Sequence, residues 1–184
     1  GTSQGIPIIG CDCRVCLSPD PRDKRLRTAF YLESATTKIA VDAGPDFRQQ
    51  FLQNGLYDVD AILITHEHQD HTAGLDEVRA INFLQHKTIP VYGSASALAR
   101  LREQYSYIFT QPDYPGIPRI ELRELPNQTF SIGDIEITPI DLLHMKLPVK
   151  GFRFGEFTYI TDANSISESE KAKVAGSKYL VLNA

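Results

Sequence analysis

The sequence has little of what would place a protein in a membrane or on nucleic acid. No apolar run in its 184 residues approaches the ~20 residues that a membrane-spanning helix needs, and the first residues lack the apolar core of a secretory signal. Basic residues are fewer than acidic ones, 19 against 23, for a formal net charge of -4. Nucleic-acid surfaces usually carry a basic excess. We therefore expect no membrane partner and do not expect nucleic acid to be the main one.

Cysteine and methionine are also scarce. The three cysteines are an odd number, which favours a reducing compartment, and we expect a cytoplasmic protein. Met145 is the sole methionine, so the sequence does not begin with one, and it ends on the strand-like 179–184. We expect both ends to be trimmed. The apolar content of 42% and charged content of 23% are ordinary, and residues 1–184 are expected to form a single domain.

Three of the five histidines stand together in the segment 65–71, Thr-His-Glu-His-Gln-Asp-His. The segment follows Ala61-Ile62-Leu63-Ile64, a continuous apolar run typical of a strand buried on both faces. A core disfavours such a polar cluster, because each buried polar group needs a partner. A solvated loop is the plain alternative. Imidazole and carboxylate together suit zinc, manganese or iron, and we interpret the segment as a metal site.

The pattern His-x-His-x-Asp-His after an apolar strand resembles the signature of the metallo-β-lactamase superfamily. The resemblance implies an α/β fold, an αββα sandwich, with two metals at one edge of the sheets. It assigns His66 and His68 to the first metal, and Asp70 and His71 to the second.

Three further site residues are implied by the same resemblance. His144 would complete the first metal's ligands, Asp162 would bridge the two metals, and Asp42 would orient the metal loop from behind. Taken alone, each has a plainer interpretation. His144 follows an apolar strand like many core or loop histidines, Asp42 could be a turn or cap carboxylate, and Asp162 could introduce a helix. The antibiotic-hydrolysing branches usually have Cys or Ser at the bridging position, so Asp162 argues against that activity.

The cysteines form the pattern Cys11-x-Cys13-x-x-Cys16, which can bring three thiols to one zinc. Spacing alone leaves open three unlinked thiols, or one disulfide and a free thiol. Together with the start 1–7 and the segment 42–48, Asp-Ala-Gly-Pro-Asp-Phe-Arg, this pattern resembles the phosphoribosyl 1,2-cyclic phosphate phosphodiesterase group of the superfamily. That resemblance implies a structural zinc on these cysteines, completed by a later histidine. No histidine follows His144, so we expect that ligand, one ligand of the second metal and the last part of the fold to be missing.

The remaining pattern gives a coarse order of elements. We expect a β-hairpin over 27–42, a helix between Pro45 and Gly55, and helices over 73–85 and 94–107. Strands follow over 120–140, then a hairpin over 152–160 and a helix over 167–175 that begins with a capping box.

The expected function is hydrolysis of a small cyclic or diester phosphate by a hydroxide that bridges two metals, manganese or zinc. Asp70 and Asp162 are the expected catalytic carboxylates. One alternative is a nuclease that processes the 3′ end of tRNA, which shares the ligands and the Gly-Thr-Ser start but needs a basic RNA-binding arm. The other is a metal-binding carrier of the same fold that catalyses nothing. A homodimer is left open.

Overall fold

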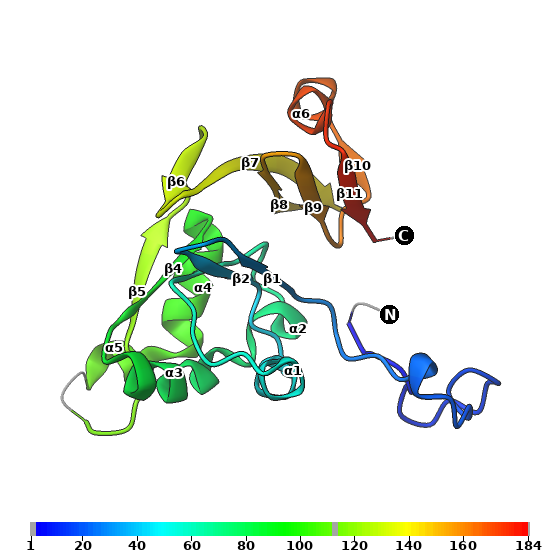
Figure 1. Cartoon of the computed structure of the whole chain (residues 1–184), viewed down its shortest axis with the longest axis horizontal. Helices are drawn as coiled ribbons and strands as arrows, with labels where there is room; N and C mark the ends of the chain where they lie inside the picture. The colour runs from blue at the N-terminus through cyan, green and yellow to red at the C-terminus, as the bar shows by residue number, and fades with distance from the viewer. Residues whose placement is uncertain (1–2, 112–113, 184) are drawn as a thin grey trace.

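The computed structural model describes residues 3–111 and 114–183, whose strands form two sheets (Figure 1). The first sheet contains, in spatial order, β1 (Phe30–Glu33), β2 (Lys38–Val41), β3 (Ala61–Leu63), β4 (Ile89–Gly93) and β5 (Ile120–Glu124). The second contains β10 (Ser165–Ile166), β7 (Ile135–His144), β8 (Leu147–Phe154), β9 (Phe157–Ile160) and β11 (Tyr179–Leu182), with β6 (Phe130–Ile132) paired to β7.

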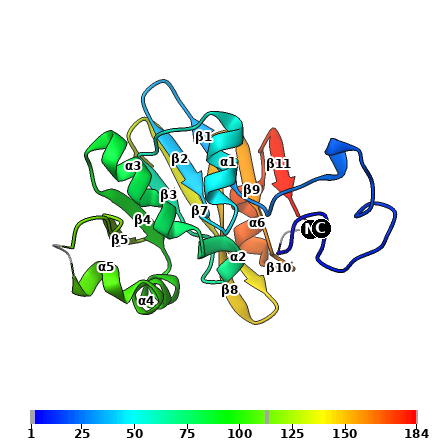
Figure 2. The same cartoon turned by 90° about the horizontal axis from the view of Figure 1, so that it is seen from below.

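The helices of the described residues lie outside this pair of sheets. They are α1 (Phe47–Asn54), α2 (Gln69–Thr72), α3 (Val78–Gln85), α4 (Ala95–Gln104), α5 (Ser106–Thr110), α6 (Glu168–Val174) and the 3₁₀ turns η1 (Pro21–Asp23) and η2 (Leu75–Glu77). Helices α1, α3 and α4 pack on the first sheet, and α6 lies beyond the second (Figures 1 and 2). This is the predicted αββα sandwich, so the fold class is confirmed. Among these elements, none is a helix long and apolar enough to cross a membrane.

The first sheet is buried on both faces because its residues point alternately to two cores. Ile39, Val41 and Leu63 face the second sheet, where they meet Ile137 and Phe152. The residues between them point the other way, and Ala40 and Ile62 join the core under the helices. Every residue of β3 is buried, which is why this strand reads as a continuous apolar run rather than an alternating one.

Strand direction brings the ends of several strands to one edge of the sandwich. Strands β2, β3 and β4 are parallel neighbours. Strands β7 and β9 are each antiparallel to β8 and so run the same way, and β11 is parallel to β9. The segments that follow β2, β3, β7, β9 and β11 can therefore meet, and the site is built from them.

The helix expected over 73–85 is interrupted in the structure. Helix α2 already begins inside the histidine segment, and a turn at Gly74 separates it from η2 and α3. The Gly74 N–H donates to the carbonyl of Ala43 at 2.8 Å, and the Ala43 N–H donates to the carbonyl of His71 at 2.8 Å. These bonds to the segment after β2 take the place of helical ones. The helix expected over 94–107 is likewise divided, at Tyr105, into α4 and α5.

The described part of the N-terminal arm, residues 3–28, projects away from the sandwich (Figures 1 and 2). It is attached through Arg27, whose backbone N–H and guanidinium donate to the Asp46 carboxylate at 2.7 and 3.0 Å. The Gln50 side chain donates to the Arg27 carbonyl at 2.7 Å. Asp46 and Gln50 thus tie the base of the arm to the start of α1.

The close approach of Gly44 to the histidine segment yields a stability prediction. A Cβ at Gly44 would lie 2.1 Å from the Asp70 carbonyl oxygen, so Gly44→Ala must push the two segments apart. We expect a destabilisation of about 1–3 kcal/mol, as for other overpacked sites, and a fall in Tm of about 3–9 °C for a chain of this size. Gly93→Ala is the matched control, because the nearest atom to its added Cβ is a flexible Leu98 methyl at 3.2 Å. Equal melting temperatures for the two variants, measured by calorimetry, would contradict this explanation.

Candidate metal centre

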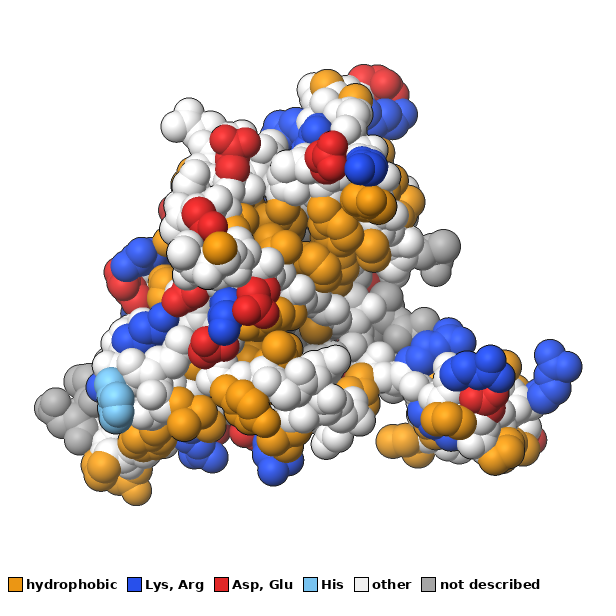
Figure 3. Space-filling view, viewed as in Figure 1, with side chains coloured by type: hydrophobic (Ala, Val, Ile, Leu, Met, Phe, Trp, Pro, Cys, Tyr) orange, Lys and Arg blue, Asp and Glu red, His pale blue; other side chains and the backbone are white. Residues whose placement is uncertain are grey.

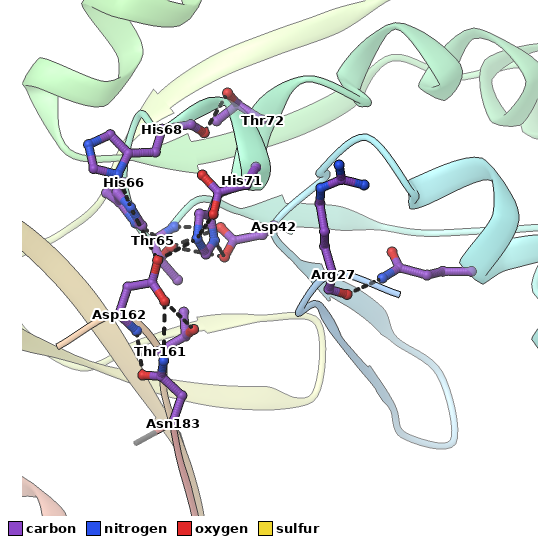
Figure 4. A network of polar contacts seen from close by, with 12 residues as sticks. Arg27, Asp42, Thr65, His66, His68, His71, Thr72, Thr161, Asp162 and Asn183 are labelled. Atoms are coloured by element: carbon purple, nitrogen blue, oxygen red, sulfur yellow. Dashed lines mark hydrogen bonds and ion pairs between the residues drawn. The ribbon is translucent and has the colours of Figure 1, made fainter. Parts of the chain in front are cut away.

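The polar residues singled out in the sequence gather at the edge where the strands end, and Figure 4 shows Asp42, His66, His68, His71 and Asp162 among them. Asp42 follows β2, the histidine segment follows β3, His144 ends β7, and Asp162 comes two residues after β9. The first sheet thus supplies the segment with most of the histidines. The second sheet, which packs against the first, supplies His144 and Asp162.

Three of these side chains converge directly. One ligand atom each from His66, His71 and Asp162 lie within 4.8 Å of one another. His71 Nε2 is 2.9 Å from Asp162 Oδ2, and His66 Nε2 is 3.9 Å from the same oxygen. Both imidazoles are fully buried, with at most 1% of each side chain exposed. Two nitrogens and one carboxylate oxygen therefore point at a common place.

Asp42 fixes the orientation of this group from behind. Its carboxylate accepts from His71 Nδ1 at 2.6 Å, from the Thr65 N–H at 2.8 Å and from the Thr65 hydroxyl at 2.9 Å. Because the Thr65 hydroxyl donates its only proton to Asp42, its contact with His66 Nδ1 at 3.0 Å assigns the proton there to the imidazole. Both His66 and His71 are thus held through Nδ1, which leaves Nε2 of each directed toward Asp162.

The other predicted ligands lie around this centre. His68 Nδ1 is 3.0 Å from His66 Nε2, and an Asp70 carboxylate oxygen is 3.3 Å from His71 Nε2. The His144 ring centroid is 5.9 Å from that of His66 and 5.5 Å from that of His68. All six predicted ligands therefore lie at this edge. Among the described residues, ligand atoms of His66, His71 and Asp162 form the close group, and His68, Asp70 and His144 lie around it.

The charges of the cluster shift the pKa values of its members in opposite directions. Burial and the neighbouring His71 lower the pKa of His66 to about 4. Burial also opposes charge on His71, but the Asp42 carboxylate and the bonds to Asp162 and Asp42 outweigh it and raise its pKa to about 10. The bond from His71 lowers the pKa of Asp162 to about 2. His66 is thus a neutral nitrogen donor, and Asp162 is an ionised carboxylate.

This donor set fits a transition metal. Neutral imidazole nitrogens and carboxylate oxygens suit zinc and manganese. The residues come from segments that the fold holds at fixed places, and the nitrogens that do not face Asp162 are already bonded. The chemistry of the cluster agrees with the sequence interpretation of 65–71 as a metal site.

Comparison with known proteins gives the family. Residues 37–184 match the family model described as the beta-lactamase superfamily domain. The chain belongs to the beta-lactamase superfamily. Its members are metal-dependent hydrolases, so the family and the donor set agree.

Two solved structures resemble this superfamily member over nearly its whole length. A diphosphatase described as a new member of the PhnP family is 33% identical, with a TM-score of 0.88, over 98% of this chain and 69% of that one. Zinc-bound PqqB from Methylobacterium extorquens is 19% identical, with a TM-score of 0.79, over 100% of this chain and 70% of that one, and so shares the fold. The diphosphatase of the PhnP family supports the predicted resemblance to the phosphodiesterase group, and PqqB supports the fold.

The curated relatives are longer proteins. An octanoyltransferase of Porphyromonas gingivalis is 39% identical over 100% of this chain, which corresponds to 37% of its own length. A ribonuclease Z of Methanopyrus kandleri is 30% identical over 67% of this chain and 42% of its own length. The chain thus spans less than half of the length of these two relatives.

The three cysteines form a second cluster, in the N-terminal arm. Their sulfur atoms lie within 4.8 Å of one another, and all three thiols are free. A hydrogen bond from the Cys16 backbone, together with bonds from the Cys11 and Cys16 thiols, lowers the pKa of Cys13 to about 7. The thiolate is the form that binds zinc. Within the part of the chain that the structure describes, no fourth His, Cys, Asp or Glu joins this cluster.

Sequence reasoning missed three residues that hold the centre. Thr65 links Asp42 to His66, while Thr161 and Asn183 contact Asp162. Thr65 stands beside the histidine motif, so its place at a strand end was a usable signal. The roles of Thr161 and Asn183 had no comparable signal, because each contacts the Asp162 side chain and neither is itself a predicted ligand.

The Asp42 contacts predict a loss of metal affinity on mutation. In Asp42→Asn the side-chain amide keeps one oxygen acceptor but turns its NH₂ group toward one of the present donors. We expect affinity for zinc or manganese to fall about 10–100-fold, as for other partners of metal-binding histidines. Asp58→Asn is the control, since Asp58 is a partly exposed partner of Lys38 and lies outside the cluster. Metal titration followed by calorimetry measures both, and unchanged affinity in Asp42→Asn would show that the contact to His71 is dispensable.

Proposed function

We propose that this chain carries a two-metal centre that hydrolyses a small cyclic phosphate or phosphate diester. The observation that carries the proposal is the convergence of His66 and His71, which follow β3 of the first sheet, on one oxygen of Asp162, which follows β9 of the second. A carboxylate shared by two histidines of one motif suits a bridge between two cations. A single cation would need only one of the two groups of ligands, either the group of His66 or the group of His71.

The residues divide between two cations. His66, His68 and His144 would hold the first, Asp70 and His71 the second, and Asp162 would contact both. Manganese or zinc fits these nitrogen and oxygen donors. When bound, two such cations supply an activated water for in-line attack on phosphorus and offset negative charge on the phosphate oxygens.

The residues of the chain itself orient this chemistry. Asp42 accepts from His71 and fixes which ring nitrogen faces the site. Asp162 is held ionised, so it brings negative charge to the place where cations would bind. Water is kept from the rear of the centre because His66, His71 and Asp42 are each at most 1% exposed.

The substrate class is supported by the relatives and by the bridging residue. The diphosphatase of the PhnP family is 33% identical to this chain and acts, by its description, on a phosphorus compound. Aspartate at position 162 agrees with a phosphodiesterase rather than an antibiotic-hydrolysing enzyme. We propose that the substrate is small, because the net charge of -4 offers little attraction for a long polyanion.

Nuclease activity is the second candidate, and two observations favour it. A ribonuclease Z is 30% identical over 67% of this chain. The arm also has a basic stretch, with five Lys and Arg against three Asp over residues 11–27, and Lys and Arg side chains are prominent on the arm in Figure 3. Two of the five are paired, Arg22 with Asp20 and Arg27 with Asp46. We therefore rank RNA below a small diester.

At the cysteines we propose one structural zinc. Three thiols converge there, and the lowered pKa of Cys13 favours the thiolate that zinc requires. This zinc would stiffen the projecting arm and take no part in hydrolysis.

The hydrolase proposal predicts metal-dependent turnover of bis(p-nitrophenyl) phosphate. Protein loaded with manganese or zinc should hydrolyse it, and chelation should abolish the activity. His66→Ala and Asp162→Ala should each lower kcat by more than about 100-fold, because they remove ligands rather than outer partners. His86→Ala is the control, since His86 lies at the end of α3 and outside the cluster. Metal bound with no turnover would favour the carrier of the same fold. Binding of tRNA that weakens steeply with salt, with cleavage near its 3′ end, would favour the nuclease.

The structural zinc predicts a change in stoichiometry. Cys13→Ser should lower the zinc content by one ion per chain and leave the affinity of the His/Asp centre for manganese unchanged. Mass spectrometry of metal content checks the first and titration the second. Equal zinc content in the variant and the parent would overturn the cysteine assignment.

A further inference from the structure

We infer that Asn183 is a positioning residue that sets which oxygen of Asp162 faces the metal centre. The inference rests on the proposed function, because it assigns a role toward the bridging carboxylate. Nothing in the sequence marks Asn183, which is the first residue after β11. The contacts of its side chain with Asp162 carry the argument (Figure 4).

The Asn183 amide bonds to Asp162 twice. Its Oδ1 accepts from the Asp162 backbone N–H at 2.7 Å, and its Nδ2 donates to Asp162 Oδ1 at 3.3 Å. The orientation of the amide is fixed by the first bond, because a backbone N–H can only donate and must face the amide oxygen. The amide nitrogen is then directed at the carboxylate.

These bonds give the two carboxylate oxygens of Asp162 different partners. Oδ1 accepts from Asn183 Nδ2 and from the Thr161 hydroxyl, each at 3.3 Å. Oδ2 faces the histidines, 2.9 Å from His71 Nε2 and 3.9 Å from His66 Nε2. With Oδ1 held by two donors, the carboxylate presents one defined oxygen to the site.

The backbone of Asp162 explains why such a clamp is needed. Asp162 has a φ of 54°, a left-handed conformation that non-glycine residues rarely adopt. Strand β11 is parallel to β9 with Leu182 opposite Ile160, and the Asn183 N–H donates to the Ile160 carbonyl at 3.3 Å. This register brings Asn183 beside the turn at Asp162. There its side chain accepts from the Asp162 backbone N–H and donates to the Asp162 carboxylate.

Asn183→Asp tests this role with nearly the same shape. The variant keeps an oxygen that accepts from the Asp162 N–H, but it replaces the amide donor with a second carboxylate oxygen beside Asp162 Oδ1. Repulsion should turn the Asp162 carboxylate. We expect the affinity of the centre for Co²⁺ to fall about 10–100-fold, as when other partners of a ligand are lost. The visible absorption of the bound Co²⁺ should also change, since that spectrum depends on the oxygens that coordinate the ion.

Three further variants make the outcome decisive. Asn183→Ala removes both bonds without adding charge, should weaken Co²⁺ binding about 10-fold, and serves if Asn183→Asp does not fold. Asn54→Asp controls for added charge, because the Asn54 side chain donates to the Gln50 carbonyl of its own helix. Asp162→Asn separates the two proposals. If it binds Co²⁺ like the parent, the proposed two-metal centre fails. If it binds weakly while both Asn183 variants keep the parental affinity and spectrum, the centre stands and the role of Asn183 is overturned.

Discussion

The hydrogen bonds that join Asp42, His71 and Asp162 are the interaction on which the rest of the site depends. They run from the end of β2 in one sheet to the end of β9 in the other, at 2.6 and 2.9 Å through the two nitrogens of a single buried imidazole. A buried carboxylate such as Asp42 is costly without partners, and here it accepts from Thr65 as well as from His71. The backbone adds a second link between the sheets, from the Lys150 N–H to the Thr65 carbonyl at 2.9 Å. The geometry of the site is therefore set by how the sheets pack.

Of the four non-glycine residues with a left-handed backbone in the described part of the chain, two are carboxylates of this site. Asp42 and Asp162 both have left-handed backbones, with φ of 66° and 54°, and such residues cost of order 1–3 kcal/mol each. Each follows a strand and turns its carboxylate back toward the site. At Asp42, the hydrogen bonds from Thr65 and His71 offset this conformational cost. At Asp162, the hydrogen bonds with Asn183 offset it. A left-handed backbone held by side-chain bonds at a proposed metal site agrees with a functional constraint on the fold at Asp42 and Asp162.

The sequence predicted those parts of the molecule in which the signal is local. The apolar run 61–64 predicted a strand buried on both faces, and the histidine segment after it predicted a metal-binding cluster. His144 and Asp162 stand 73 and 91 residues from His71, and no spacing rule connects them to it, because their place depends on how two sheets pack. Only the family resemblance identified them. The break at Gly74 was missed because the bond that interrupts the helix goes to Ala43, which is close in space but distant in sequence. Asn183 was missed because it contacts a carboxylate rather than a substrate.

The division of the site between the sheets also connects metal binding to stability. His66 and His71 belong to the first sheet, and His144 and Asp162 to the second. A cation held by these groups would cross-link the two layers, so the free energy of binding would add to the free energy of folding. The Asp162 carboxylate and the imidazole of His71, whose pKa is raised to about 10, already bond to each other across the same gap, and the proton on Nε2 belongs to that bond. A cation would have to displace that proton from Nε2. The hydrogen bond between His71 and Asp162, which links the two sheets, is thus the bond with which a metal competes. The net stabilisation by a metal would be the free energy of its binding less the free energy of the hydrogen bond that it replaces.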